Sequence, residues 1–337
     1  MHAVPEKTCA ALMAALERTA LAAGADLLTE AKAVDLWVND ADQIVAVGYQ
    51  RPDGALEHVG CDYLLLACNG FGGNASMVAD LLPAMRDAVF AGHVGNDGSA
   101  IEWGRELGAR LADLEGYQGH GSWVTPQGAL MTWAVIMKGG VQVNKHGKRF
   151  HNETQGYSEA AVHVLQQPGS IAWNVFDAEQ LALAREFPDF VQAESAGALR
   201  SAADIQALAG VIGCPVQALE ETLQTISTCA ESGTADPFGR PFARALVAPY
   251  YAVRVTGALF HTQGGLDIDG HGRVLRSDGQ PFSNLLAAGG AARGVSGNDV
   301  SGYLSGNGLL SAVGGGWLAA GTIIEAHRQA TADGAAK

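Results

Sequence analysis

The stretch that decides the fold runs from Asn284 to Glu325 and reads NLLAAGGAARGVSGNDVSGYLSGNGLLSAVGGGWLAAGTIIE. A short apolar strand at 285–288 leads into glycines, a loop of Gly, Ser and Asn follows, and a helix of small residues begins near Asn307. Glycines at such a junction let backbone N–H groups approach a ligand closely, and a helix start adds partial positive charge. The stretch therefore predicts a seat for an electron-rich or anionic group, although glycines alone would favour a tight strand-to-helix turn.

The composition is that of a globular protein long enough for two domains, with 337 residues of which 48% are hydrophobic and 17% charged. The formal net charge of −14 argues against nucleic acid as a partner, because phosphate binding needs a basic face. No uninterrupted apolar run reaches about 18 residues, and no export signal is apparent. The sequence therefore predicts a cytoplasmic protein with no membrane span.

The cysteines are odd in number, widely scattered and form no CxxC pair. They are Cys9, Cys61, Cys68, Cys214 and Cys229. This usage favours reduced thiols over a disulfide framework or a zinc site, so no metal is predicted. Covalent haem is excluded because there is no CxxCH. Any electron partner is therefore expected to be diffusible or a separate chain.

Residue patterns predict a helix over 5–24, followed by short strands. The strands are expected at 26–29, 32–38, 44–49, 56–61 and 63–68. A hairpin is predicted over 141–150 and a strand over 171–176. Helices are predicted at 202–208 and 215–229, and the Ala-rich residues 329–337 predict a disordered tail.

Four further motifs accompany the opening stretch. They are LLLACNGFGGN at 64–74, GNDGSAIEWGRELGA at 95–109, GGVQVNKHGKRFHNE at 139–153 and VAPYYAVRVTGALFHTQGG at 247–265. Together the five motifs resemble the flavoprotein family of soluble fumarate reductases, succinate dehydrogenase flavoprotein subunits and 3-ketosteroid dehydrogenases. The resemblance covers nearly the whole chain, in the family's order.

The resemblance implies an α/β fold in which a Rossmann-like, glutathione-reductase-type domain binds FAD. An α+β capping domain is expected at 115–254, inserted between FAD-binding segments at 1–114 and 255–328. Such domains begin with a GxGxxG turn that holds a pyrophosphate, and this sequence contains none. Gly70–Asn74 matches the family's later Gly turn instead. The fold is therefore expected to be N-terminally incomplete by about one βαβ unit, and FAD binding by this chain alone is an open question.

The resemblance also implies which residues contact FAD. They are Val34, Ala67, Gly70, Gly95, Asp97, Gly98, Gly265, Gly289, Gly290, Ser305, Gly306, Asn307, Gly308 and Leu309. Asp97 also suits a helix cap, and the two roles are compatible. Gly290 stands where the family carries an acidic residue that contacts the ribityl chain.

An enzyme that moves hydride between flavin and a C–C bond needs a proton donor or acceptor and polar groups that grip a carbonyl or carboxylate. By resemblance, His120 and His261 match the family's two substrate-binding histidines, and Glu153 matches its proton-relay carboxylate. Taken alone, each lone His would more often be a hydrogen-bonded core or surface residue.

Arginines of the fumarate-reducing members are missing here. The proton-donating Arg falls on or near Leu181, the relay Arg on Tyr157 and the carboxylate-clamping Arg on Tyr303. Losing these guanidinium groups makes fumarate or succinate an unlikely substrate. Arg185 or Arg293 could substitute, although surface solvation is the more ordinary fate of Arg185. A phenol can bind a ketone oxygen or act as an acid or base, and Tyr303 could also pack under the flavin.

The preferred hypothesis is an FAD-dependent dehydrogenase or ene-reductase, with an enone, ketone or carboxylate substrate and an unknown electron partner. The catalytic candidates are His120, Glu153, Tyr157, His261 and Tyr303. A second hypothesis is a non-catalytic fragment that needs a missing segment or partner to bind FAD. A nicotinamide-dependent Rossmann dehydrogenase is a weaker third, because no dinucleotide fingerprint occurs.

Overall fold

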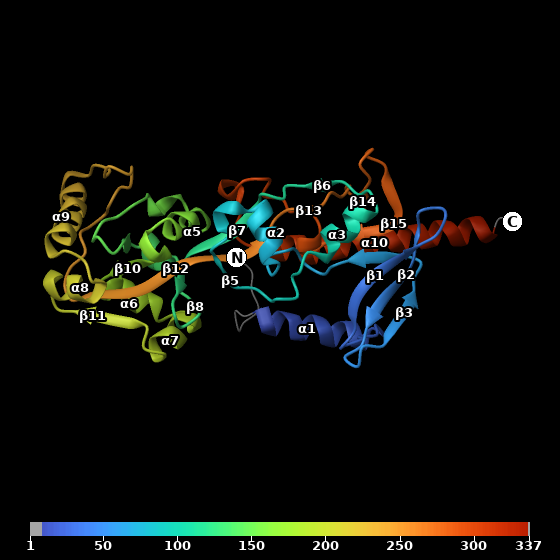
Figure 1. The fold of residues 1–337 in the computed structure, drawn as a ribbon, viewed down its shortest axis with the longest axis horizontal. Helices are drawn as coiled ribbons and strands as arrows, with labels where there is room; N and C mark the ends of the chain where they lie inside the picture. The colour runs from blue at the N-terminus through green and yellow to red at the C-terminus, as the bar shows by residue number, and fades with distance from the viewer. Residues whose placement is uncertain (1–8, 336–337) are drawn as a thin grey trace. The chain divides into compact units, whose positions relative to one another are not determined.

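The computed structural model describes residues 9–335, with side chains from 10 to 332. Backbone contacts divide the chain into two compact units, Met1–Leu64 and Leu65–Lys337 (Figure 1). The domain boundaries predicted at 114/115 and 254/255 both fall inside the second unit and remain predictions.

The first unit contains one helix and a small antiparallel sheet in the order β1-β2-β3. Its elements are α1 (Cys9–Ala22), β1 (Lys32–Val38), β2 (Ile44–Gln50) and β3 (Leu56–Gly60). Asn39 closes the first turn by accepting the N–H groups of Ala41 and Gln43. Gly54, with φ of +87°, closes the second. The strand predicted at 26–29 is wrong, because these residues pair with no described strand.

The second unit carries every other element. Its strands are β4 (Leu64–Leu66), β5 (Val89–Phe90), β6 (Leu111–Ala112), β7 (Tyr117–Val124), β8 (Ala129–Leu130), β9 (Val141–Val143), β10 (Ala172–Phe176), β11 (Leu199–Ala202), β12 (Tyr250–Thr262), β13 (Gly265–Leu266), β14 (Arg273–Leu275) and β15 (Pro281–Ala287). Its α-helices are α2 (Ala75–Leu81), α3 (Ser99–Glu106), α4 (Ala134–Met137), α5 (Tyr157–Leu165), α6 (Ala178–Ala184), α7 (Pro188–Ser195), α8 (Ile205–Ile212), α9 (Val216–Ser232) and α10 (Asn307–Ala335). Its 3-10 turns are η1 (Pro83–Met85), η2 (Glu153–Gln155), η3 (Pro168–Ser170), η4 (Gly289–Ala291) and η5 (Val300–Gly302).

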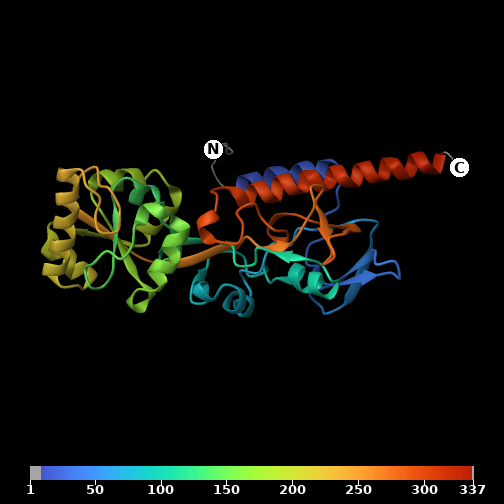
Figure 2. The same ribbon diagram turned by 90° about the horizontal axis from the view of Figure 1, so that it is seen from above.

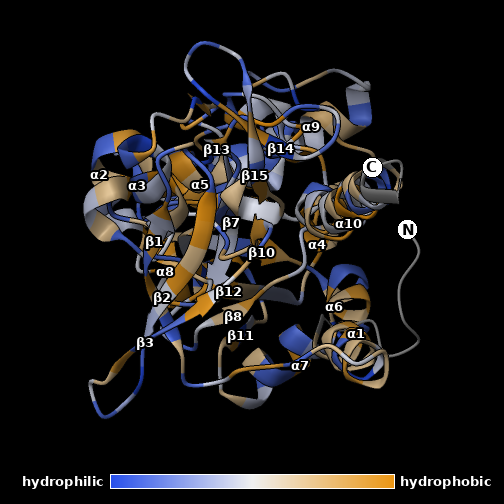
Figure 3. Cartoon of the chain, turned by 90° about the vertical axis from the view of Figure 1, so that its right-hand side faces the viewer, coloured by the Kyte–Doolittle hydropathy of each residue, from blue (hydrophilic) through white to orange (hydrophobic). Residues whose placement is uncertain are grey.

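The long strand β12 organises the largest sheet. The order is β8-β7-β12-β10-β9, and β11 and β5 also pair with β12 (Figure 1). Most of β12 is buried, and Figure 3 shows it largely in the colour of hydrophobic residues. One apolar core forms where α8 and α9 cover β9 and β10, and a second forms beneath α6 and α7. Strand β12 contributes residues to both cores, so it connects them.

The hairpin predicted at 141–150 is only partly correct. Residues 141–143 form β9, but β9 pairs with β10, with Val143 opposite Trp173. The turn after β9 is closed by the Asn144 N–H, which donates to the carbonyl of Lys148. No second strand follows this turn, because the next residues enter the buried ion cluster described below.

Helix α10 is one continuous helix that begins at Asn307 as predicted (Figure 2). It runs to Ala335, so the disordered tail predicted from residue 329 is wrong for the described residues. Ala has the highest helix propensity, which explains the extension. Over Asn307–Ala332 α10 is long and apolar enough to cross a membrane by length and composition alone. That match is weak evidence for a span, because helices of soluble proteins pass the same test.

Candidate active site

Five aromatic side chains of the second unit lie ring against ring. This group, called the aromatic site below, consists of His120, Tyr157, Phe260, His261 and Tyr303. His120 stacks against Tyr157 at 5.0 Å and against Phe260 at 5.4 Å between ring centroids. Tyr303 meets Tyr157 edge-on at 5.9 Å and His261 at 6.1 Å. The structure therefore brings together four of the five predicted catalytic residues, all except Glu153.

Adjacent strands position the two histidines. His120 lies on β7 opposite Ala258 of β12, and His261 lies on β12 opposite Gln118 of β7. The register between these strands shifts between Leu259 and His261. Such an irregularity re-aims a side chain, which is why strand irregularities are common beside binding sites.

Glycines on either side of His120 let helix α5 approach strand β7. A Cβ at Gly119 would come within 2.7 Å of Ala161, and a Cβ at Gly121 within 2.6 Å of Ala160. Real Cβ atoms do not come so close, so only glycine permits this packing. The close approach places Tyr157, the first residue of α5, against the ring of His120.

The aromatic site carries no formal charge near neutral pH. Burial lowers the pKa of His120 to about 3 and also lowers that of His261. Burial raises the pKa of Tyr303, and the neighbouring Tyr157 raises it further. Across residues 9–335, no Arg or Lys side chain pairs with these five rings. The site therefore suits an uncharged ligand better than a dicarboxylate.

A hydrogen bond joins the cap region to the Gly-rich loop before α10. The hydroxyl oxygens of Tyr157 and Ser305 are 2.8 Å apart, and either can donate. Tyr303 also interacts with the Tyr157 hydroxyl. Hydroxyl groups in such a chain can pass a proton along it.

Gln263 orients the imidazole of His261. The side-chain nitrogen of Gln263 lies 2.9 Å from Nδ1 of His261, and Gln263 is itself buried. His261 in turn faces the first turn of α10, where a Cβ at Gly308 would lie 3.0 Å from its Nε2. The predicted substrate histidine thus contacts the helix start predicted to hold the cofactor.

Glu153 lies in a separate, fully buried ion cluster. One of its oxygens accepts from the Gln142 N–H at 3.0 Å and from Nε of Arg149 at 2.8 Å. The other pairs with Arg149 and, at 2.9 Å, with Arg240. Burial alone would raise the pKa of Glu153, but the two guanidinium groups outweigh it and lower the pKa to about 2.

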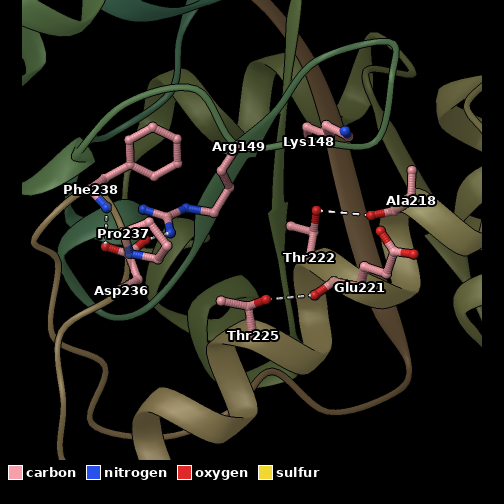
Figure 4. Close-up of a pocket in the computed structure, with 9 residues that line it drawn as sticks. All are labelled: Lys148, Arg149, Ala218, Glu221, Thr222, Thr225, Asp236, Pro237 and Phe238. Carbon is pink, nitrogen blue, oxygen red and sulfur yellow. Dashed lines mark hydrogen bonds and ion pairs between the residues drawn. The ribbon is translucent and has the colours of Figure 1, made fainter.

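This arrangement does not favour the relay role that the resemblance implies for Glu153. Both carboxylate oxygens are occupied, and no hydrogen bond or ion pair joins Glu153 to the aromatic site among the described residues. Arg149 also pairs with Asp236 beside a surface pocket of about 200 Å³ (Figure 4). The cluster therefore joins segments of the region predicted to form the cap, and a relay function of Glu153 stays a prediction.

The candidate substitutes for the missing arginines lie outside the aromatic site. Leu181 is buried in the apolar core beneath α6. Arg185 is on the surface, 53% exposed and paired with Glu194 at 2.6 Å, as expected of a solvated side chain. Arg293 pairs with Asp113 at 2.8 Å. Neither arginine replaces a guanidinium at the aromatic site.

Two of the predicted cofactor glycines pack against each other. A Cβ at Gly70 would overlap the side chain of Thr262, and a Cβ at Gly290 would overlap Asn69 and approach the Gly70 nitrogen. These glycines allow the turn after β4 to lie directly against η4. The absence of side chains at Gly70 and Gly290 therefore allows these two segments to pack closely.

The loop at 95–98 starts helix α3. The Asp97 carboxylate accepts the Ser99 N–H at 3.1 Å, but Gly98 occupies the N-cap position, so Asp97 precedes the cap that was predicted for it. Gly98 has a left-handed φ of +86° at the N-cap. Gly95 donates its N–H to the His93 ring at 3.0 Å.

Gly265 of β13, another predicted cofactor residue, packs tightly against Ala291.

The start of α10 leaves room for a ligand. Gly306 has a left-handed φ of +88° and open space around it, and Ser305 beside it is exposed. The hydroxyl of Ser311, one turn into the helix, is buried without a partner. It lines a cavity of about 10 Å³ with Gly289, Gly308 and neighbouring residues, which is room for about one water. An orphaned hydroxyl beside open glycines at a helix start fits the polar edge of a flavin.

Four other residues predicted to contact FAD lie on different elements of the chain. Ala67 follows β4 and is exposed, Leu309 on α10 is 51% exposed, and Asn307 is buried at the helix start. Val34 lies on β1 of the first unit and is 38% exposed. Contact of these four residues with FAD stays a prediction.

Sequence reasoning missed three residues that the structure places at or beside the aromatic site. They are Trp133, Phe260 and Gln263. Phe260 and Gln263 lie within two positions of His261 in the motif FHTQGG. Their closeness in sequence to a predicted site residue could have identified them. Trp133 lies 13 positions from His120 and no motif marked it, and only packing brings their rings to 5.8 Å.

Comparisons with known proteins show which family the chain is similar to. The family model described as "FAD binding domain" matches residues 1–309. The probable fumarate reductase Ifc3 of Shewanella frigidimarina is 29% identical over 300 residues, which are 88% of this chain and 50% of the relative. The 3-oxosteroid 1-dehydrogenase of Mycobacterium tuberculosis is 28% identical over 281 residues, 71% of this chain and 49% of the relative.

A solved structure agrees over nearly the whole chain. The open conformation of a flavocytochrome c3 fumarate reductase superposes with a TM-score of 0.77 at 28% identity, covering 92% of this chain and 54% of the other. The predicted mixed α/β fold is confirmed at this level. The chain spans about half the length of the curated relatives it matches.

Proposed function

Because the chain belongs to the family of FAD-binding domain proteins, we propose that it is an FAD-dependent oxidoreductase acting on a C–C bond next to a carbonyl. The observation that carries the substrate class is the uncharged aromatic site. Tyr157 and Tyr303 occupy it where fumarate-reducing members carry arginines by resemblance, and no guanidinium replaces them. A neutral ketone or enone is therefore favoured over a dicarboxylate.

Each side chain of the site has a task in this reaction. Bound FAD supplies the two-electron chemistry in the form of hydride transfer. The Tyr157 hydroxyl, bonded to Ser305, donates or accepts the proton at the neighbouring carbon. His261, held by Gln263, lies between the substrate and the start of α10. Phe260 and Tyr303 supply flat apolar walls that exclude water.

The finer details of the fold belong to the same proposal. We infer a Rossmann-like, glutathione-reductase-type FAD-binding domain with a cap at 115–254. The residues that would hold FAD are those around the start of α10, namely Ser305, Gly306, Gly308 and Ser311. Their fit rests on the open space at Gly306 and the unpartnered Ser311 hydroxyl.

The test is to purify the chain with added FAD, remove free FAD by gel filtration and record the visible spectrum. Retained flavin absorption is expected. The flavin is then reduced without oxygen, and 2-cyclohexen-1-one, 4-androstene-3,17-dione or fumarate is added in separate samples. Reoxidation by an enone but not by fumarate supports the proposal, whereas reoxidation by fumarate alone would contradict the substrate class.

A second candidate function is a fragment that binds FAD only with another segment or subunit. Its supporting observation is an apolar stripe on α10 that nothing covers among the described residues. The exposed members are Leu309, Leu310, Val313, Trp317 and Ile324, which are 51–77% exposed. An apolar stripe of this kind usually marks a contact surface. A colourless chain that takes up no added FAD would favour this candidate, as would a GxGxxG sequence encoded upstream of Met1.

A further inference from the structure

Trp133 has a buried hydrogen-bond donor without an acceptor. The residue precedes α4 and is 7% exposed, and its indole Nε1 makes no hydrogen bond. Most buried polar atoms in proteins are paired, and an unpaired one costs about 1–3 kcal/mol. An orphaned donor at this depth therefore calls for an acceptor that the chain itself does not supply.

The indole lies against the aromatic site. Its ring meets His120 edge-on, with the centroids 5.8 Å apart and the planes at 90°. It also shares a small apolar cluster with Ile136, Ala160 and Tyr157. The indole that carries the unpartnered donor thus contacts two candidate catalytic residues.

His120, whose ring contacts that of Trp133, presents a second donor. The Ser122 N–H donates to Nδ1 of His120 at 3.0 Å, so Nδ1 carries the lone pair. Burial keeps the imidazole neutral, because it lowers the pKa to about 3. The single ring proton must then be on Nε2, and no residue in the described part of the chain accepts it.

We propose that Nε2–H of His120 and Nε1–H of Trp133 together bind the carbonyl oxygen of the substrate. This inference rests on the proposed function and deepens it by naming the residues that hold the carbonyl. Two neutral donors stabilise the partial negative charge that grows on a ketone oxygen when the neighbouring C–C bond gains or loses hydride. They do not neutralise a carboxylate, which agrees with the absence of arginine.

The surrounding rings make this a dry site. Tyr157 and Phe260 are half-buried and stack on His120, whereas His120 and Trp133 beneath them are 5% and 7% exposed. A carbonyl that reaches the two donors must displace part of this cover. Hydrogen bonds formed there are shielded from water and hence stronger than at the surface.

The test uses Trp133→Phe, which keeps an aromatic ring and removes only the N–H donor. Trp123→Phe is the matched control, since Trp123 contacts Phe260 but not His120. The probe is 2-cyclohexen-1-one, titrated by calorimetry into each FAD-supplemented protein. Losing one hydrogen bond should weaken binding by about tenfold in Trp133→Phe and leave Trp123→Phe unchanged. Equal affinity of Trp133→Phe and the unmodified chain would overturn the proposal.

A second measurement follows enone binding to the unmodified chain and uses the variant only to assign a signal. The indole N–H signal of Trp133, assigned as the one of six that Trp133→Phe lacks, is followed by 15N NMR during enone titration of the unmodified chain. It should shift as the carbonyl binds. A signal that stays fixed while tyrosine signals move would show that Trp133 only packs.

The two proposals fail differently. If the unmodified chain binds no enone, both the proposed carbonyl site and the proposed substrate class are wrong. If it binds enone in a Trp133-dependent way but its flavin is never reoxidised by enone, the proposed redox function falls and the carbonyl site stands.

Discussion

The phenolic oxygen of Tyr157 lies 2.8 Å from the hydroxyl oxygen of Ser305, although 148 positions separate the two residues in the chain. Tyr157 begins helix α5 in the cap region, and Ser305 lies in the Gly-rich loop before α10. The bond therefore links the region predicted to form the cap to the loop predicted to contact the cofactor.

Removing the Tyr157 hydroxyl should abolish most of the proton transfer. Tyr157→Phe keeps the ring that stacks on His120, and turnover with an accepted enone should fall by roughly 10²–10⁴-fold, the usual contribution of a general acid or base. Ser305→Ala leaves the phenol in place, so its effect should be much smaller. Single-turnover flavin kinetics measures both. Equal losses in the two variants would assign the proton transfer to the pair rather than to Tyr157.

His261 should affect catalysis without affecting cofactor content. Its ring faces Gly308 and is held by Gln263, so His261→Ala removes a substrate contact and leaves the backbone at the start of α10 intact. Turnover should decline while the flavin-to-protein absorbance ratio stays the same. Loss of flavin from His261→Ala would instead identify His261 as a cofactor residue.

The buried cluster around Glu153 should matter for stability. Arg240→Met leaves the buried Glu153 carboxylate with one cationic partner fewer, and breaking a buried pair typically costs about 3–5 kcal/mol. Urea unfolding measures this cost. Arg185→Ala, which breaks the exposed pair with Glu194, is the control and should change the free energy of unfolding by about 0–1 kcal/mol. A small effect of Arg240→Met would mean that the cluster does not brace the cap.

Acid should destabilise the fold through His120. Its pKa is about 3 when folded and 6.5 when unfolded, so below pH 6.5 the unfolded chain binds the extra proton. The contribution of neutral His120 to the free energy of unfolding is fully present above pH 6.5 and is lost as the pH falls toward 3. Between pH 6.5 and 5 the loss should be about 2 kcal/mol.

Urea unfolding at several pH values tests this expectation. His120→Gln should flatten the slope between pH 6.5 and 5, whereas His271→Gln, at an exposed position, should not. An unchanged slope in His120→Gln would show that His120 is protonated in the folded protein.

Two glycines should respond to alanine in opposite ways. A Cβ at Gly290 would overlap Asn69, so Gly290→Ala should lower the free energy of unfolding by about 1–3 kcal/mol. Gly321 lies in α10 with open space around it, so Gly321→Ala should raise the free energy by about 0.5–1 kcal/mol through helix propensity. Thermal unfolding compares the two variants. If Gly290→Ala kept its stability but lost flavin, Gly290 would be a cofactor contact after all.

Residue patterns alone predicted the family, the strands over 32–38 and 44–49, the start of α10 near Asn307 and four residues of the aromatic site. These features could be predicted because strand periodicity, helix-start glycines and motif order are local properties of the chain. The wrong predictions, a strand at 26–29 and a disordered tail from 329, concern segments whose local pattern was weak.

The partners of Glu153, the packing of Gly70 against Gly290 and the position of Trp133 could not be predicted and depend on the folded chain. Each depends on residues distant in sequence, such as Arg240 beside Glu153 and Asn69 beside Gly290. Whether a buried carboxylate is braced or free, and whether an indole N–H finds an acceptor, is set by which segments fold against it. Burial and pairing arise only when those segments meet, so no local pattern encodes them.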